Sequence, residues 1–148
     1  MNRATAAALL AVGVVLTVAA LVLPLYSSAY PGGVEVIVRA WGTEIVNKPG
    51  DWPPGELSPL YAIPLTVTAA ALAASVFLRR RLAAYTALGG AAAQVGAVGI
   101  LLTLLLSEKG HVDETAGQSF SPGIGVMLLV VGTVAAVVGA IALQREAA

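Results

Sequence analysis

Long apolar runs dominate the sequence, and short polar segments separate them. Four runs contain no Asp, Glu, Lys, Arg or His, and they cover residues 4–25, 60–78, 82–106 and 122–143. An α-helix of about 20 residues crosses the roughly 30 Å hydrocarbon core of a bilayer. The pattern therefore predicts an all-α membrane protein with one domain, 1–148, in which four transmembrane helices form an antiparallel bundle.

A triplet of arginines, Arg79, Arg80 and Arg81, separates the second run from the third. One guanidinium at the centre of a membrane helix costs roughly 2.5–3.5 kcal/mol, so the triplet marks a place where the chain emerges into water. Three adjacent cations are also suited to contact anionic lipid headgroups. We interpret 79–81 as a tight turn at the membrane surface.

The remaining charges segregate along the chain. Arg3 and Arg145 fall on the same predicted side as the triplet, whereas seven of the eight acidic residues fall in 26–59 and 107–121. Cytoplasmic segments of membrane proteins carry the excess of Lys and Arg. We therefore predict a multi-pass protein of the cell membrane, with both termini and the 79–81 turn cytoplasmic and the loops 26–59 and 107–121 external.

Composition supports a lipid environment and narrows the chemistry. Hydrophobic residues make up 58% of the chain and charged residues 11%, and the mean hydropathy is +0.88; a soluble domain carries about 25% charged residues. The chain has no Cys, which excludes disulfides, thiol catalysis and Cys-ligated metals. Beyond the triplet it has no basic patch for nucleic acid. The first expected partner is the lipid bilayer.

The first run, 4–25, is open to two interpretations. It is long enough to be a transmembrane helix. A signal peptide is the alternative, because Asn2 and Arg3 can serve as its charged end and 27–29 as a small-residue cleavage site. The run exceeds the apolar core of about 7–15 residues usual in signal peptides, so we favour a retained helix.

The loop 26–59 is the segment predicted to fold outside the membrane. Residues 34–41 alternate and are rich in Val and Ile, which predicts a strand, and 43–46 can pair back onto it. The Pro- and Gly-rich stretch 49–55 excludes a helix or a central strand. Trp41 and Trp52 are predicted to anchor this loop at the headgroup level.

Prolines help to place the predicted helix starts. Pro59 suits a first helical turn, whereas Pro64 is expected to bend the second helix or loosen its outer end. Ser121 and Pro122 form an N-cap and first-position pair that predicts the start of the fourth helix.

Four polar residues fall near the middle of the four predicted spans. They are Thr17, Thr68, Gln94 and Thr133. At a similar depth in the bilayer they could meet, and two interpretations follow. Intramembrane polar groups can line a binding spot or a solute path; alternatively, Gln94 forms an interhelical hydrogen bond and each Thr bonds to its own helix. We favour the second.

Small residues recur on two predicted helices. Gly125, Gly132 and Gly139 repeat every seven residues, so they share one face of the fourth helix. Gly89, Gly96 and Gly99, with Ala93, give the third helix a smooth face. Such faces let membrane helices approach closely. The simpler expectation is that helices three and four pack together within the monomer; the alternative is an interface with a partner or a second copy.

Catalytic and metal-binding signals are weak. His111 lies close to Glu108, Asp113 and Glu114, but the chain has no other His and no Cys to complete a metal site. Motifs for phosphate, dinucleotide, serine-hydrolase or zinc-protease chemistry are absent from the sequence. We predict no enzymatic activity, no cofactor and no bound metal.

In layout the chain resembles the claudin-type tetraspan architecture. The resemblance lies in a long first external loop with strand character, a tight inner turn, a short second external loop, Trp41 and the Gly50-Asp51-Trp52 triplet. The two Cys typical of that family's loop are missing, so the resemblance implies a topology and carries no function.

Three functional hypotheses remain. We favour a non-enzymatic accessory or structural subunit, or an assembly factor, that contacts a protein partner or forms a homo-oligomer. A small oligomeric transporter or channel built around the mid-membrane polar layer is the alternative, although transport usually leaves a charge or broken helices at mid-depth. A receptor surface on the external loop is a third, weaker possibility.

Overall fold

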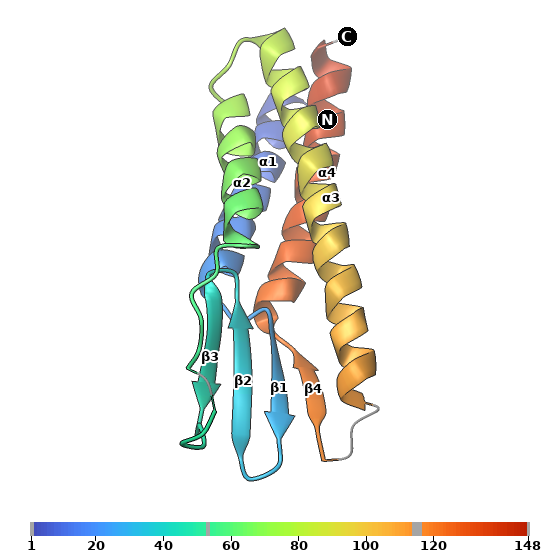
Figure 1. Cartoon of the computed structure of the whole chain (residues 1–148). Helices are drawn as coiled ribbons and strands as arrows, with labels where there is room; N and C mark the ends of the chain where they lie inside the picture. The colour runs from blue at the N-terminus through green and yellow to red at the C-terminus, as the bar shows by residue number, and fades with distance from the viewer. Residues whose placement is uncertain (1, 53, 114–116, 148) are drawn as a thin grey trace.

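A computed structural model describes residues 2–52, 54–113 and 117–147. These residues form a mostly helical molecule with a small antiparallel sheet at one end of a helical bundle (Figure 1). The helices are α1 (Arg3–Val22), α2 (Ala62–Ser75), α3 (Arg80–Asp113) and α4 (Ile124–Ala147), and the strands are β1 (Tyr26–Tyr30), β2 (Val34–Arg39), β3 (Gly42–Val46) and β4 (Ser119–Pro122).

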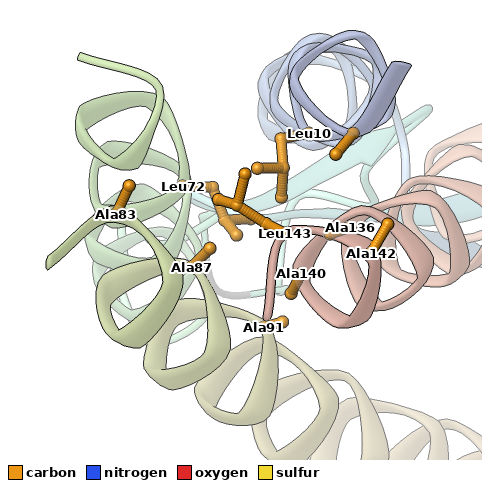
Figure 2. Packing of buried hydrophobic residues seen from close by; sticks show 10 residues of the cluster. Leu10, Leu72, Ala83, Ala87, Ala91, Ala136, Ala140, Ala142 and Leu143 are labelled. Atoms are coloured by element: carbon orange, nitrogen blue, oxygen red, sulfur yellow. The ribbon is translucent and has the colours of Figure 1, made fainter. Parts of the chain in front are cut away.

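Each helix packs against two others, so that the four close a ring. α1 contacts α2 and α4, and α3 also contacts α2 and α4. Successive helices run in opposite directions, and both ends of the chain lie at the end of the bundle opposite the sheet (Figure 1). Near that end the core is built of leucines and many alanines, including Leu10, Leu72, Ala87 and Ala140 (Figure 2). The small alanine side chains allow the helices to come close.

The most extensive helix pair, α1 with α4, is packed through glycines. A Cβ added at Gly132 would lie 2.9 Å from the Cβ of Leu16, and one at Gly139 would lie 3.0 Å from the carbonyl oxygen of Ala6. Gly125 is equally tight against the carbonyl oxygen of Pro24, at 2.7 Å. The seven-residue glycine repeat therefore contacts α1. Helices α3 and α4 do pack together within the monomer, as expected, but the glycine repeat lies in the contact with α1 and the segment that follows it.

The sheet joins the two segments predicted to be external loops. Its strand order is β3-β2-β1-β4, and every neighbouring pair is antiparallel. Ser28 in β1 pairs with Val36 on one side and with Phe120 on the other. Two of these strands were predicted, namely β2 and β3. β1 and β4 were not, because their sequences are short and rich in Ser, without the alternation that indicates a strand.

Backbone hydrogen bonds fix the sheet to the helix ends. Leu25 donates its amide to the Val38 carbonyl at 2.8 Å and accepts the amide of Gly123 at its own carbonyl, also at 2.8 Å. The amide of Ala62 at the start of α2 bonds to the Ala40 carbonyl at 3.1 Å. Leu25, Ala40 and Ala62 are fully buried. The sheet is therefore an extension of the bundle core, with its strands held directly by the chain entering and leaving the helices.

Several predicted boundaries differ from the structure. α1 ends at Val22, short of residue 25, because Pro24 restricts the residue before it and removes a donor. α2 begins at Ala62, so Pro64 falls within its first turn, where its missing N–H breaks no helical bond. α4 begins at Ile124, because Ser121 and Pro122 belong to β4 and do not cap the helix.

The largest correction concerns α3. Residues 107–113, assigned to the short loop 107–121, continue the helix. Val112 in this extension is almost fully buried, as is Leu105 two turns earlier, and α3 packs against β4. Apolar contacts with the sheet therefore extend the helix past its apolar run. Glu114, also assigned to this loop, lies outside the described residues.

Three helical segments are long and apolar enough to cross a membrane by length and composition. They are Arg3–Val22, Arg80–Val112 and Ile124–Glu146. Helix α2 is apolar but has 14 residues, which corresponds to roughly 21 Å at about 1.5 Å per residue. It is shorter than the predicted span 60–78, because turns replace helix at both ends of that run.

Candidate functional site: the polar core and the α2–α3 groove

A buried polar group links three helices at the centre of the bundle. The Gln94 side chain on α3 donates from Nε2 to the Thr17 hydroxyl of α1 at 2.8 Å and to the Thr133 hydroxyl of α4 at 3.1 Å. Each Thr hydroxyl in turn donates to the carbonyl four residues earlier in its own helix, on Gly13 and Leu129, at 2.7 Å. Thus the structure brings together three of the four predicted mid-span residues.

The fourth residue, Thr68 on α2, bonds within its own helix. Its hydroxyl donates to the Leu65 carbonyl at 3.0 Å. Gln94 is fully buried, and its Oε1 has no hydrogen-bond partner among the described residues. A buried acceptor without a donor costs about 1–3 kcal/mol. Gln94 therefore links α3 to α1 and α4 by hydrogen bonds, and its Oε1 is left as an unpaired acceptor among the described residues.

The small-residue face predicted on α3 is open. A Cβ added at Gly89, Gly96 or Gly99 would have no neighbour within 4 Å. The glycine that does face another helix is Gly90, where a Cβ would lie 3.3 Å from the Ala71 side chain of α2. We call Gly89, Gly96 and Gly99 the open α3 face. A side chain at any of these three positions would meet no other residue, so packing within the monomer does not explain why they are glycines.

An apolar groove lies between α2 and α3 in the half of the bundle next to the sheet, and Gly96 of the open α3 face forms part of its wall. Its volume is about 490 Å³, which falls within the roughly 300–1,000 Å³ typical of ligand pockets. We call it the α2–α3 groove. Its walls come from the start of α2 and from small and apolar residues of α3, among them Leu60, Tyr61, Pro64, Ala93, Ala97 and Leu104.

Polar groups gather at the sheet end of this groove. Tyr61 lines the groove, and Glu108 lies one helical turn beyond Leu104 on the same side of α3. Tyr26 in β1 is part of the same cluster and stacks on Phe120, with ring centroids 5.4 Å apart. Burial, followed by the proximity of Tyr61, Glu108 and Tyr30, raises the pKa of Tyr26 to about 12. Tyr61 thus lines the groove, and Glu108 and Tyr26 lie near Tyr61 at the sheet end.

Sequence reasoning did not identify this cluster. Glu108 was assigned to the external loop 107–121, away from the helices. The signal that could have found it is the spacing 97, 101, 104 and 108, which continues one helical face beyond the apolar run.

The two tryptophans occupy different parts of the sheet region. Trp41 follows β2 at its helix-proximal end, where its carbonyl accepts the amide of Ser58 at 2.8 Å. Trp52 instead packs edge-on against Tyr30, with centroids 5.5 Å apart. Tyr30 ends β1 at the hairpin farthest from the helices (Figure 1). The two tryptophans therefore lie at different distances from the helix ends, and their role as headgroup-level anchors stays a prediction.

The arginines cluster at the end of the bundle opposite the sheet. Arg79 lies in the turn between α2 and α3, whereas Arg80 and Arg81 begin α3, and all three are exposed. Arg3 at the start of α1 donates to the Leu78 carbonyl at 3.1 Å, which ties the first helix to this turn. This end of the molecule presents a cationic surface around an apolar bundle.

His111 is exposed on the last turns of α3. Among the described residues, no group of three or more His, Asp or Glu side chains is placed to hold a metal ion.

Comparisons with known proteins add no assignment. No protein-family model matches this chain, and no curated protein matches it in sequence.

Proposed function

We propose that this chain is a small, non-enzymatic integral membrane protein that acts as an accessory or structural subunit. One observation carries the proposal: the molecule is polar inside and apolar outside at mid-height. Val15, Val67, Ile100 and Val134, one from each helix, are 59–65% exposed, whereas Gln94 is fully buried. In water this arrangement would leave a continuous apolar surface unprotected. In a bilayer the same surface is solvated by lipid.

The sheet supports four crossings even though α2 is short. β1 and β4 are paired, so the segments on either side of α2 and α3 must lie on one side of the membrane. Two crossings, by α2 and α3, return the chain to that side. Exposed apolar residues flank α2 at Leu60 and Phe77 and extend its hydrophobic length. The positive-inside rule then makes the arginine end and both termini cytoplasmic, and the sheet external.

The open α3 face supports an accessory role. Glycines that meet nothing within the monomer allow another helix backbone to approach closely, which is how helices associate in lipid. We propose that a transmembrane helix of a larger membrane protein packs on Gly89, Gly96 and Gly99. The sheet at the end of the bundle, proposed to be external, provides further contacts for the same partner.

A small oligomeric transporter is the second candidate, because the Gln94 Oε1 acceptor is unused. The accessory role is better supported, because the other groups of the polar layer already bond to one another and Gln94 is sealed from solvent. A transporter predicts that Gln94→Leu abolishes solute flux in liposomes containing the purified protein. An accessory subunit predicts that the wild-type protein produces no flux.

Cysteine crosslinking in native membranes tests the accessory role, because the chain has no Cys of its own. Single cysteines at positions 89, 96 and 99 are expected to trap a discrete, stoichiometric larger complex with a bifunctional thiol- and amine-reactive crosslinker. Val15→Cys and Val67→Cys, which are exposed on α1 and α2, serve as controls and should not trap it. Equal crosslinking from all five positions would contradict a specific interface on α3.

A further inference from the structure

We propose that the α2–α3 groove binds a membrane phospholipid whose headgroup carries a primary ammonium, with an acyl chain in the groove and the ammonium at Glu108. The inference rests on the proposed membrane location and adds to it a specific ligand and a specific site. It stands on three observations: the apolar walls of the groove, the polar cluster at one end, and the charge of that cluster.

The groove is suited to a hydrocarbon chain. Along its length the described walls are Leu, Ile, Pro and Ala side chains and the backbone of Gly96, with the Tyr61 ring near the mouth. Leu60 and Ile100 at its sides are largely exposed, so the groove opens onto the surface proposed to face lipid. Small residues of α3, Ala93, Gly96 and Ala97, produce the hollow, because larger side chains there would fill the space beside α2.

The headgroup end is defined by the register of α3. Ala97, Leu101 and Leu104 line the groove, and Glu108 follows at the next turn on the same helical face. Tyr61 lines the groove itself, and Tyr26 lies close enough for both Tyr61 and Glu108 to act on it electrostatically. The register therefore places the Glu108 carboxylate at the sheet end of the groove, near the Tyr61 phenol that lines it.

The charge of this cluster selects among lipid headgroups. Among the side chains that the structure describes, a salt bridge joins Arg39 to Glu44, and none is found at Glu108. A carboxylate repels an anionic headgroup and accepts charge-assisted hydrogen bonds from an ammonium. A primary ammonium donates three such bonds, whereas a trimethylated one donates none. Phosphatidylethanolamine is therefore favoured over phosphatidylcholine and phosphatidylglycerol.

A second copy of the chain fits the groove less well. A two-fold dimer in a membrane holds both copies at the same depth, so docking through this groove would bring two Glu108 carboxylates to the same height beside the interface. Like charges near one another in a poorly solvated contact are unfavourable. A lipid ammonium compensates the carboxylate instead.

Native mass spectrometry of the detergent-solubilised full-length protein tests the proposal with defined lipids. We expect phosphatidylethanolamine to bind about three- to tenfold more tightly than phosphatidylcholine, in keeping with one or two charge-assisted bonds at a partly wet site. Glu108→Gln should reduce phosphatidylethanolamine binding to the phosphatidylcholine level. Ala97→Phe, which fills the groove, should weaken binding of both lipids.

Matched variants separate the site from general effects. Glu56→Gln removes an exposed carboxylate from the loop before α2, and Val134→Phe enlarges an exposed residue of α4; neither should change binding. Equal binding of all headgroups by the wild type, or no effect of Glu108→Gln, would overturn the proposal. So would a dimer trapped by Ala97→Cys that excludes lipid.

The result also separates this inference from the proposed function. A chain that stays dispersed without detergent overturns both. A chain that requires detergent and crosslinks to a partner through the open α3 face, yet shows no headgroup preference, overturns the lipid site alone.

Discussion

Gly13 and Gly132 determine how closely α1 approaches α4. A Cβ at Gly13 would lie 2.9 Å from the Gly132 carbonyl oxygen, and one at Gly132 would lie 2.9 Å from the Leu16 Cβ. Both neighbouring atoms belong to helix backbones or to the root of a side chain, so neither can move without shifting a helix. The close contact between α1 and α4 therefore requires glycine at positions 13 and 132.

Gly132→Ala is therefore expected to destabilise the protein. Overpacking costs about 1–3 kcal/mol, against a gain of up to about 1 kcal/mol from the better helix propensity of Ala. The denaturation midpoint of the purified protein in detergent measures the balance and should fall. Gly89→Ala is the control, since its Cβ would enter open space and should not lower the midpoint. Equal losses for the two variants would contradict the packing described for α1 and α4.

Tyr26 provides a titration that reports on the junction of sheet and bundle. Its pKa is raised to about 12, chiefly by burial and further by Tyr61 and Glu108, so the folded state favours the neutral phenol. An exposed tyrosine ionises near 10. As pH rises, this tyrosine therefore ionises in the unfolded chain before it ionises in the folded protein. The free energy of unfolding is expected to decline as pH rises from about 10 to about 12.

Ultraviolet absorbance of tyrosinate measures this pKa directly. The difference between titrations of the wild type and Tyr26→Phe isolates one phenol, which should ionise near 12. Ionisation of that phenol near 10 would show that Tyr26 is solvated and would remove the polar cluster from the groove mouth.

At the scale of elements, the sequence predicts best where a long uncharged run or a Val-rich alternation determines the structure. Uncharged runs marked all four helices, because a charge at mid-membrane is costly. The Val-rich alternation marked β2 and β3. Helix ends and strands were predicted wrongly where contacts with other elements determine them. β1 forms because it lies between β2 and β4, and its sequence, Tyr-Ser-Ser-Ala-Tyr, carries little preference of its own.

The candidate site shows the same division. The polar layer of Thr17, Gln94 and Thr133 could be anticipated, because helices that share a bilayer bring mid-span residues to similar depth. The groove could not, since it depends on which helices are neighbours and on the length of α3. The glycine repeat of α4 indicated a close helix contact but not that α1 would provide it.

The extension of α3 beyond its apolar run depends on contacts with the sheet. Val112 is 1% exposed in the last turns of the helix. Val112→Asn is expected to lower stability by about 2–4 kcal/mol, because apolar burial is lost and an amide enters an apolar contact. Ser107→Asn, at an exposed position of the same helix, should have little effect. Similar denaturation midpoints for both variants would contradict docking of the extension on the sheet.

At the scale of the whole molecule, the pairing of β1 with β4 constrains the topology more than hydropathy does. In the proposed membrane location, this pairing requires the segment before α2 and the segment after α3 to share one side. If α2, with its 14 residues, failed to cross, those segments would be on opposite sides and the strands could not meet. The short helix is therefore as necessary to the proposed topology as the three long ones.

Labelling of intact cells tests that topology. In the Cys-free chain, a cysteine at position 111 should react with a membrane-impermeant thiol reagent, because the sheet end of α3 is proposed to be external. A cysteine at position 80 should react only after the membrane is permeabilised, because the arginine end is held at the anionic cytoplasmic leaflet. A third cysteine at position 45 in β3 should match position 111, because the sheet keeps both on one side. Reaction at 80 without reaction at 111 would invert the proposed orientation, and different accessibility at 45 and 111 would exclude a sheet built from both segments.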